Sequence, residues 1–189
     1  NLYATGSDNE AGAGNLGTYS LTKNSSNNVW SIKIEGDLNS IYYTYSITNN
    51  GKTQETQDIY SVATGVNGER SMVTNLDTTD PENWENDKHM LVDKQTDAVI
   101  WEVHVRDFSI SDTSGVKDEY QGKYLAFTQD GTKINGSDSL STCVDYLVEQ
   151  GVNYVHLNPV YDYGSVDETK LDTPQYNWGY DPVNYNVPE

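Results

Sequence analysis

The chain has 189 residues and a formal net charge of −18, with 11 Lys and Arg against 29 Asp and Glu. Such a charge repels phosphate backbones and anionic lipid surfaces, which makes nucleic acid and membranes poor candidates for partners. A neutral ligand is unaffected, and 15 Tyr with 4 Trp supply many flat apolar faces. The length allows one large domain or two small ones, but a complete eight-stranded α/β barrel typically needs about 250 residues.

Cysteine content and hydropathy say little about the cellular compartment of the protein. The single Cys143 excludes a disulfide within the chain. No apolar run approaches the roughly 20 residues of a membrane span, and Asn1 begins no signal peptide. Since Asn1 to Tyr3 is already typical of a strand, we expect the native start to lie upstream.

Residues 1–92 are predicted to form an all-β domain, because short alternating runs are separated by clusters of Asn, Gly, Asp and Ser. Val29 to Ile34 and Ile41 to Ile47 both alternate. The turn residues Asn49 to Gly51 lead to a further strand around Glu55 to Tyr60. The economical fold is an immunoglobulin-like β-sandwich, truncated at its N-terminal edge.

Residues 93–189 follow a different pattern, typical of a βαβ unit. Ala98 to Val105 (AVIWEVHV) and Gly151 to Leu157 (GVNYVHL) are predicted to be buried strands. A helix between them is indicated by apolar residues at helical spacing, with Ser137 or Ser139 as its N-cap and Gly151 as its C-terminal stop. The helical set is Leu140, Cys143, Val144, Leu147 and Val148. The connection from about Asp107 to Gly136 is long, and long loops after a barrel strand lie on the catalytic face.

Ionisable residues alternate with apolar ones along both predicted strands of this unit. The first strand carries Glu102, His104 and Arg106, and the second carries Tyr154, His156 and the polar but not ionisable Asn158. If the apolar faces meet helices, both histidines point inward and could approach each other. A Glu/His/His metal site is one interpretation, but the close ligand spacing of a metal motif is missing. A hydrogen-bonded polar network is the alternative that we favour.

The ends of the two predicted strands carry residues of either structural or functional use. We expect Arg106 and Asp107 to form a salt bridge that anchors the following loop. Pro159 stops the second strand, so that Tyr161 and Asp162 face a cleft or its edge. The acids of the next loop are predicted to be solvated and not catalytic: Asp162, Asp167, Glu168 and Asp172.

The seven residues from Tyr176 to Pro182, YNWGYDP, combine aromatic side chains suited to stacking on sugars with residues that bend the backbone. Gly179 allows close approach of the backbone to a ligand, and Pro182 fixes the direction in which the chain leaves. Together with Val99 to Ser109 (VIWEVHVRDFS), this heptapeptide resembles the type I pullulanases, the α-1,6-debranching members of glycoside hydrolase family 13. The fold implied for residues 93–189 is the first βαβ portion of a (β/α)8 TIM barrel.

The resemblance implies roles for the aromatic residues of the heptapeptide. By similarity, Tyr180 stacks on the sugar at the cleavage subsite, and Trp178 borders the next subsite. We include Tyr176 and Asp181 in the same substrate-binding set. The alternative is that these aromatics only pack a loop.

Several short segments of residues 1–92 resemble the carbohydrate-binding module family 48 domain that precedes pullulanase barrels. In that family a strand usually precedes the segment NLYATGSD, which here begins at Asn1, so the sandwich is expected to lack an edge strand. The segments that carry the resemblance are Val29–Ile32, Gly36–Leu38, Tyr42–Tyr45, Val66–Arg70 and Asp80–Trp84.

The family's catalytic carboxylates are expected beyond Glu189. Retaining glycosidases need two carboxyl groups about 5 Å apart, and in the family these come from later barrel strands. We therefore assign no catalytic residue to this chain and expect it to be inactive alone. The resemblance implies an α-glucan substrate (pullulan, starch or glycogen). It also implies a partner, which is the remaining barrel half as a second chain or as a C-terminal continuation.

Two alternatives stay open: a non-catalytic starch-binding protein, and another branch-active family 13 enzyme such as an isoamylase, a glycogen debranching enzyme or a branching enzyme. No cofactor or metal is indicated by these residues, although calcium is conceivable in the complete enzyme. For localisation, an extracellular or bacterial cell-surface protein is slightly favoured over a cytoplasmic one.

Overall fold

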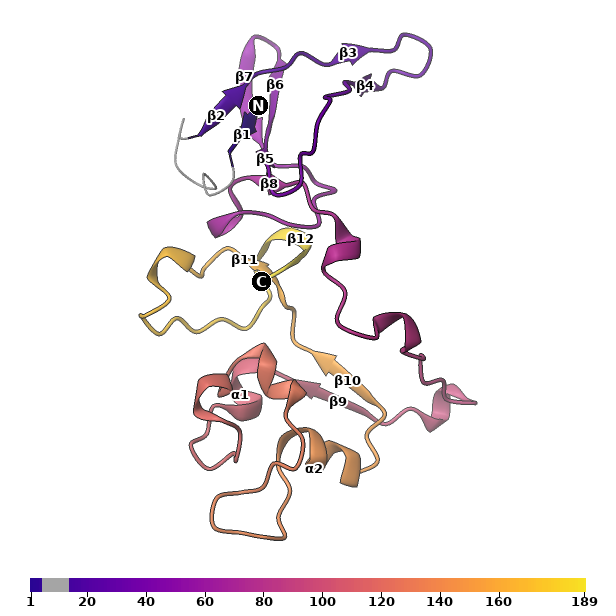
Figure 1. Ribbon diagram of the computed structural model, residues 1–189, viewed down its shortest axis with the longest axis vertical. Coiled ribbons are helices and arrows are strands. Elements are labelled where there is room, and N and C mark those ends of the chain that lie inside the picture. Colours follow the sequence, from indigo (N-terminus) through magenta and orange to yellow (C-terminus); the bar gives the residue numbers. More distant parts are fainter. Residues whose placement is uncertain (5–13) are drawn as a thin grey trace. The chain divides into compact units, whose positions relative to one another are not determined.

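The computed structural model describes residues 1–4 and 14–189 (Figure 1). They form two compact units, one of Asn1–Trp84 with Val160–Glu189 and the other of Glu85–Pro159. Residues 5–8 of the NLYATGSD segment lie outside the described residues. The division into domains at residues 92 and 93 stays a prediction, because compactness within this chain does not test where modules of a longer protein begin.

The first unit is rich in sheet and has few helices, as expected of a sandwich domain. Its largest described sheet is antiparallel, in the order β2–β1–β5–β8. The strand predicted at the start of the chain is confirmed as β1, and both of its residues are buried. The four strands are β1 (Leu2–Tyr3), β2 (Asn15–Gly17), β5 (Tyr42–Tyr43) and β8 (Ser71–Met72).

Two hairpins extend the first unit. One joins β3 (Thr22–Lys23) to β4 (Trp30–Ser31), and the other joins β6 (Tyr45–Asn49) to β7 (Lys52–Thr56). Between β6 and β7, Asn50 and Gly51 have φ values of 50° and 73°, the left-handed pair that a two-residue type I′ turn requires. The predicted turn is confirmed. The strand after it is Lys52–Thr56 and not Glu55 to Tyr60, because a two-residue turn places Lys52 directly opposite Asn49.

The last 30 residues form a further hairpin of this unit. Strand β11 (Tyr161–Tyr163) pairs with β12 (Pro182–Pro188), and the intervening loop carries the heptapeptide. A 3₁₀ turn within this loop, η7 (Glu168–Lys170), contacts another 3₁₀ turn, η1 (Val66–Gly68). The heptapeptide loop is therefore attached to the N-terminal part of the chain within one compact unit.

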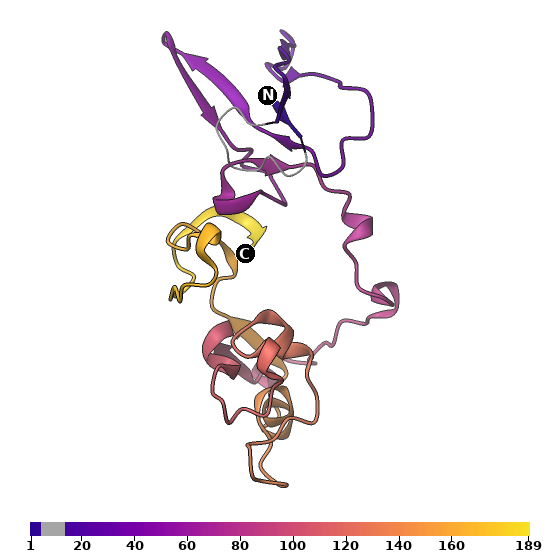
Figure 2. The ribbon, with the colours of Figure 1, turned by 60° about the vertical axis from the view of Figure 1, so that its left-hand side comes forward.

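The second unit contains the predicted βαβ arrangement. Strands β9 (Ile100–Val103) and β10 (Tyr154–Leu157) are parallel, and α2 (Cys143–Glu149) lies between them in the chain (Figures 1 and 2). The ring of Trp101 on β9 meets Tyr146 of α2 edge to face, at 5.9 Å between centroids. The side of β9 that carries Trp101 thus faces the helix.

The first strand of this unit is shorter than predicted. It ends at Val103, and α1 (Val105–Ser109) begins directly after it. His104 is the N-cap residue of α1, since its Nδ1 accepts the backbone N–H of Asp107 at 3.4 Å. The alternation of Glu102, His104 and Arg106 therefore breaks, because Arg106 lies on a helix.

The start of α2 also differs from the prediction. Its N-cap is Thr142 and not Ser137 or Ser139, and Leu140 lies outside the helix. The Ser137 hydroxyl is already used in a turn, where it accepts the backbone N–H groups of Ser139 and Leu140. Gly151, with φ of 73°, follows the C-cap and confirms the predicted stop.

The long connection between β9 and α2 is folded around a small core and is not an open loop. The buried cluster consists of Val116, Ala126 and Cys143, with Phe108 and Tyr120 packed against it. Two 3₁₀ helices supply part of it, η5 (Asp118–Tyr120) and η6 (Tyr124–Thr128). Three-residue 3₁₀ turns also precede β9 in the chain: η2 (Leu76–Thr78), η3 (Trp84–Asn86) and η4 (Gln95–Asp97). Within the described part of the chain, every helix is too short or too polar to cross a bilayer.

Candidate functional site

The heptapeptide presents three aromatic side chains to solvent. Tyr176 is 48% exposed, Trp178 61% and Tyr180 65%. The rings of Tyr176 and Trp178 brace each other edge to face, with centroids 5.7 Å apart and planes at 88°. Large exposed aromatic surface grouped in one short loop is typical of a binding surface.

The loop owes its shape to Asn177 and Gly179. The side-chain oxygen of Asn177 accepts the backbone N–H of Gly179, and its Nδ2 donates to Ser165 Oγ and, at 2.7 Å, to Asp181 Oδ1. Gly179 has φ of 86°, a left-handed conformation that a side chain would strain. These bonds stabilise the backbone turn between Trp178 and Tyr180.

Asp181 is part of this framework. Its carboxylate accepts the bond from Asn177, and its carbonyl oxygen accepts the backbone N–H of Gly164 at 2.8 Å. The hydrogen bonds from Asn177 and Ser165 lower the pKa of the Asp181 carboxyl group. Asp181 is thus an ionised residue whose hydrogen bonds connect the heptapeptide to Gly164.

Asp162 corrects one prediction. It was expected to face a cleft and to belong to a solvated acidic loop, but it is only 4% exposed. Its Oδ2 accepts a hydrogen bond from Asn184 Nδ2 at 2.6 Å, and the same amide donates to the Gly68 carbonyl oxygen at 3.0 Å. A buried carboxylate needs such a donor, and Asn184, which donates to Asp162, lies 22 positions away in the sequence.

The other acids of the loop are also engaged, except Asp172, which is exposed. Asp167 caps η7 by accepting the backbone N–H of Thr169 and pairs with Lys170 Nζ at 2.6 Å. The hydrogen bond from Lys170 is the main cause that lowers the pKa of Asp167. Glu189 lies outside this loop. Burial is the main cause that raises the pKa of its carboxyl group to about 7, and the nearby charge of Glu168 adds to the shift.

The ionisable residues of the strand pair do not form the alternative metal site. Strand register places His156 beside Glu102, while His104 caps α1 beyond the strand end. Over residues 1–4 and 14–189, no three His, Cys, Asp or Glu side chains are grouped closely enough to hold a metal ion. The predicted pair of Arg106 and Asp107 is confirmed, with Nη1 3.4 Å from Oδ1.

Comparison with known proteins gives a consistent answer, although no family model matches the chain. The pullulanase of Bacillus subtilis is 41% identical over 85% of this chain and 21% of its own length. The crystal structure of apo pullulanase from Paenibacillus barengoltzii covers the whole chain with a TM-score of 0.88 and 39% identity, over 28% of that protein. Both of these relatives are pullulanases. The resemblance predicted from the heptapeptide is confirmed.

The pullulanase relatives are much longer than this chain, which spans 21% of the Bacillus subtilis protein and 20% of the chloroplastic pullulanase 1 of Arabidopsis thaliana, 31% identical. A further structure of the Paenibacillus barengoltzii pullulanase contains maltohexaose and α-cyclodextrin. A rice chloroplastic isoamylase 3 is also similar, at 29% identity over 57% of this chain. Pullulanases are thus relatives by sequence and by structure.

Sequence reasoning found the aromatic residues of the pullulanase-like loop but missed the side chains that hold it. Ser165 and Asn184 belong to no recognisable motif, and Asn177 lies within the heptapeptide, but its hydrogen bonds to the loop were not predicted. One signal was available for a fourth residue, Asn67, because the dipeptide Asn67-Gly68 is a turn signature. The dipeptide indicates a turn, but not the loop that the turn contacts.

Proposed function

We propose that this chain is part of a pullulanase-type glycosidase that hydrolyses α-1,6-glucosidic branch links in pullulan, starch or glycogen with retention. The observation that carries the proposal is the intact YNWGYDP heptapeptide, with its aromatic side chains exposed, in a chain 41% identical to a pullulanase. The maltohexaose and α-cyclodextrin bound to a relative support an α-glucan as the substrate class.

Within this proposal, Tyr180 is the stacking platform at the cleavage subsite and Trp178 borders the next subsite. Tyr176 supports Trp178 through their edge-to-face contact. Asp181 acts through the loop, since its carboxylate is hydrogen-bonded to Asn177. The chain supplies a substrate-binding wall, and the catalytic carboxylates come from another part of the protein.

Residues 93–189 are proposed to be the opening βαβ portion of a (β/α)8 barrel, and residues 1–92 a family 48-like sandwich. Ile100 and Val155 on the strand pair are 63% and 45% exposed, which suits strands that pack against further elements. Asn158, at the end of β10, has a buried side-chain oxygen with no hydrogen-bond partner in the described part of the chain. Buried acceptors are almost always satisfied, and the remaining barrel would supply the missing donor.

A second candidate is an isoamylase-type or other branch-active family 13 enzyme. The similarity to the rice isoamylase 3 favours it, but that similarity spans a smaller part of the chain than the pullulanase matches. The third hypothesis is a non-catalytic starch-binding protein, and no observation favours it.

Hydrolysis by the complete protein tests the proposal. We expect release of reducing ends from pullulan, and little from unbranched amylose. NMR of the first product is expected to show the α-anomer, as retention requires. Residues 1–189 alone are expected to be inactive, because they lack the two carboxylates. Glycogen cleavage without pullulan cleavage would select the isoamylase-type alternative, and glucan binding without hydrolysis would select the starch-binding one.

A further inference from the structure

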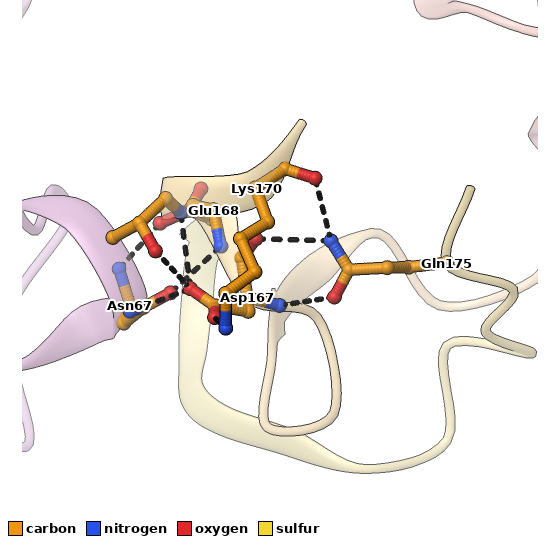
Figure 3. Close-up of polar contacts among 6 residues, drawn as sticks. Asn67, Asp167, Glu168, Lys170 and Gln175 are labelled. Carbon is orange, nitrogen blue, oxygen red and sulfur yellow. Dashed lines mark hydrogen bonds and ion pairs between the residues drawn. The ribbon is translucent and has the colours of Figure 1, made fainter. Parts of the chain in front are cut away.

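Asn67 joins the N-terminal part of the first unit to the heptapeptide loop (Figure 3). Its backbone N–H donates to Glu168 Oε2 at 2.5 Å, and its side-chain Oδ1 accepts the backbone N–H of Glu168 at 2.8 Å. Its Nδ2 lies 3.4 Å from Asp167 Oδ1. The two residues that exchange hydrogen bonds are 101 positions apart in the sequence.

The contact continues from Asp167 toward the aromatic residues. The backbone N–H of Asp167 donates to Gln175 Oε1 at 2.7 Å, and Gln175 Nε2 donates to the Asp167 carbonyl oxygen at 2.9 Å. Gln175 immediately precedes Tyr176, the first residue of the heptapeptide. Figure 3 shows the amides of Asn67 and Gln175 both hydrogen-bonded to the η7 turn. A continuous set of bonds therefore runs from Asn67 to the start of the aromatic loop.

The backbone of Asn67 is suited to this contact. Its φ of 56° and ψ of 19° are left-handed, which Asn tolerates better than most residues. This conformation allows its backbone N–H and its side chain to reach Glu168 together. A side chain without both an acceptor and a donor could not bond the Glu168 amide and the Asp167 carboxylate at once.

We propose that Asn67 is a positioning residue for substrate binding, which fixes the loop that carries Tyr176, Trp178 and Tyr180 through Asp167, Glu168 and Gln175. The inference rests on the proposed function, because it assigns the aromatic loop to the glucan. By this inference, Asn67 in the sandwich-like part of the chain sets the geometry of the aromatic loop. The effect does not require that the sandwich-like part bind glucan itself.

Asn67→Gly in the complete protein tests the inference. Glycine keeps the backbone donor and accepts the left-handed conformation, so only the side-chain bonds are lost. Asn50→Gly is the matched control, because Asn50 has the same kind of conformation (φ 50°) at the tip of the β6–β7 hairpin. Amide hydrogen exchange across residues 165–181 is expected to accelerate about tenfold or more in Asn67→Gly and to be unchanged in Asn50→Gly. Equal protection in the two variants would overturn the proposal.

Kinetics on pullulan separate positioning from general stability. We expect Asn67→Gly to lower kcat/KM about tenfold in the wild-type background, since a small misplacement of a binding group is costly. In a Tyr180→Ala background the same change is expected to cost less than twofold, because the platform that Asn67 positions is gone. Equal losses in both backgrounds would show a structural role only and would overturn the proposal.

Failure of the proposed function gives a different result. If the complete protein does not cleave pullulan, the assigned activity is wrong, and hydrogen exchange alone then decides whether Asn67 anchors the loop. If Tyr180→Ala retains wild-type kinetics, Tyr180 is not a stacking platform. This single variant shows that result independently of Asn67.

Discussion

Replacement of Tyr180 by Ala in the complete protein is expected to lower kcat/KM on pullulan about 100-fold. A ring that stacks on the sugar at the cleavage subsite orients the distorted pyranose for attack, and loss of that orientation raises the barrier to reaction. The Tyr180 side chain is 65% exposed in this chain, so its removal is expected to cost little stability. Steady-state kinetics with pullulan measure the effect.

Two controls make the Tyr180 result specific. Tyr180→Phe keeps the ring face and is expected to stay within about threefold of the wild type, since stacking needs the face more than the hydroxyl. Tyr60→Ala removes a tyrosine that is 84% exposed and lies outside the heptapeptide, and we expect unchanged kinetics. Near-wild-type kinetics of Tyr180→Ala would instead mean that the heptapeptide aromatics only shape their loop.

Local patterns predicted the elements whose partners are close in the sequence. The turn at Asn50 and Gly51 follows from their tolerance of positive φ, and the hairpin pairs residues only a few positions apart. The stop at Gly151 follows from the same property. The parallel pairing of β9 and β10 was also accessible, because two apolar runs joined by a helix have few other ways to pair.

The same patterns gave wrong predictions where a local hydrogen bond from a side chain to the backbone changed the end of an element. The predicted first strand extended through Val105, but the His104 side chain caps a helix and the strand ends at Val103. At α2, the Ser137 hydroxyl bonds within its own turn, so Thr142 becomes the N-cap. Both errors arise from side-chain hydrogen bonds to the backbone, which periodicity does not register.

For the candidate site, sequence alone indicated the aromatic residues and the family but not their support. Asn184 bonds the Gly68 carbonyl oxygen across 116 positions, and Asn67 bonds Glu168 across 101. No local window contains both partners of such a pair. The burial of Asp162 was unpredictable for the same reason, since its position after a predicted strand end is equally typical of a solvated acid.

Gly68 lies at the centre of these long-range contacts, and Gly68→Ala is expected to destabilise the first unit by about 3 kcal/mol. A Cβ at this position would lie 2.1 Å from Asp162 Oδ2 and 2.5 Å from Asn184 Nδ2. The φ of 66° adds about 1–2 kcal/mol of left-handed strain. Displacement of the buried Asp162 carboxylate from Asn184 adds about 1.5–3 kcal/mol, as expected for a hydrogen bond to a charged group.

Gly51→Ala separates the two contributions to the Gly68 effect. Gly51 has a similar φ of 73°, but its Cβ would meet nothing within 4 Å, so this variant reports left-handed strain alone. By calorimetry of the complete protein, we expect the transition of this unit to fall by about 10 °C in Gly68→Ala and by roughly half as much in Gly51→Ala. Equal shifts would contradict the clash. Asp162→Ala combined with Gly68→Ala should be less destabilising than the sum of the single changes, because removal of the carboxylate clears the space that the new methyl group needs.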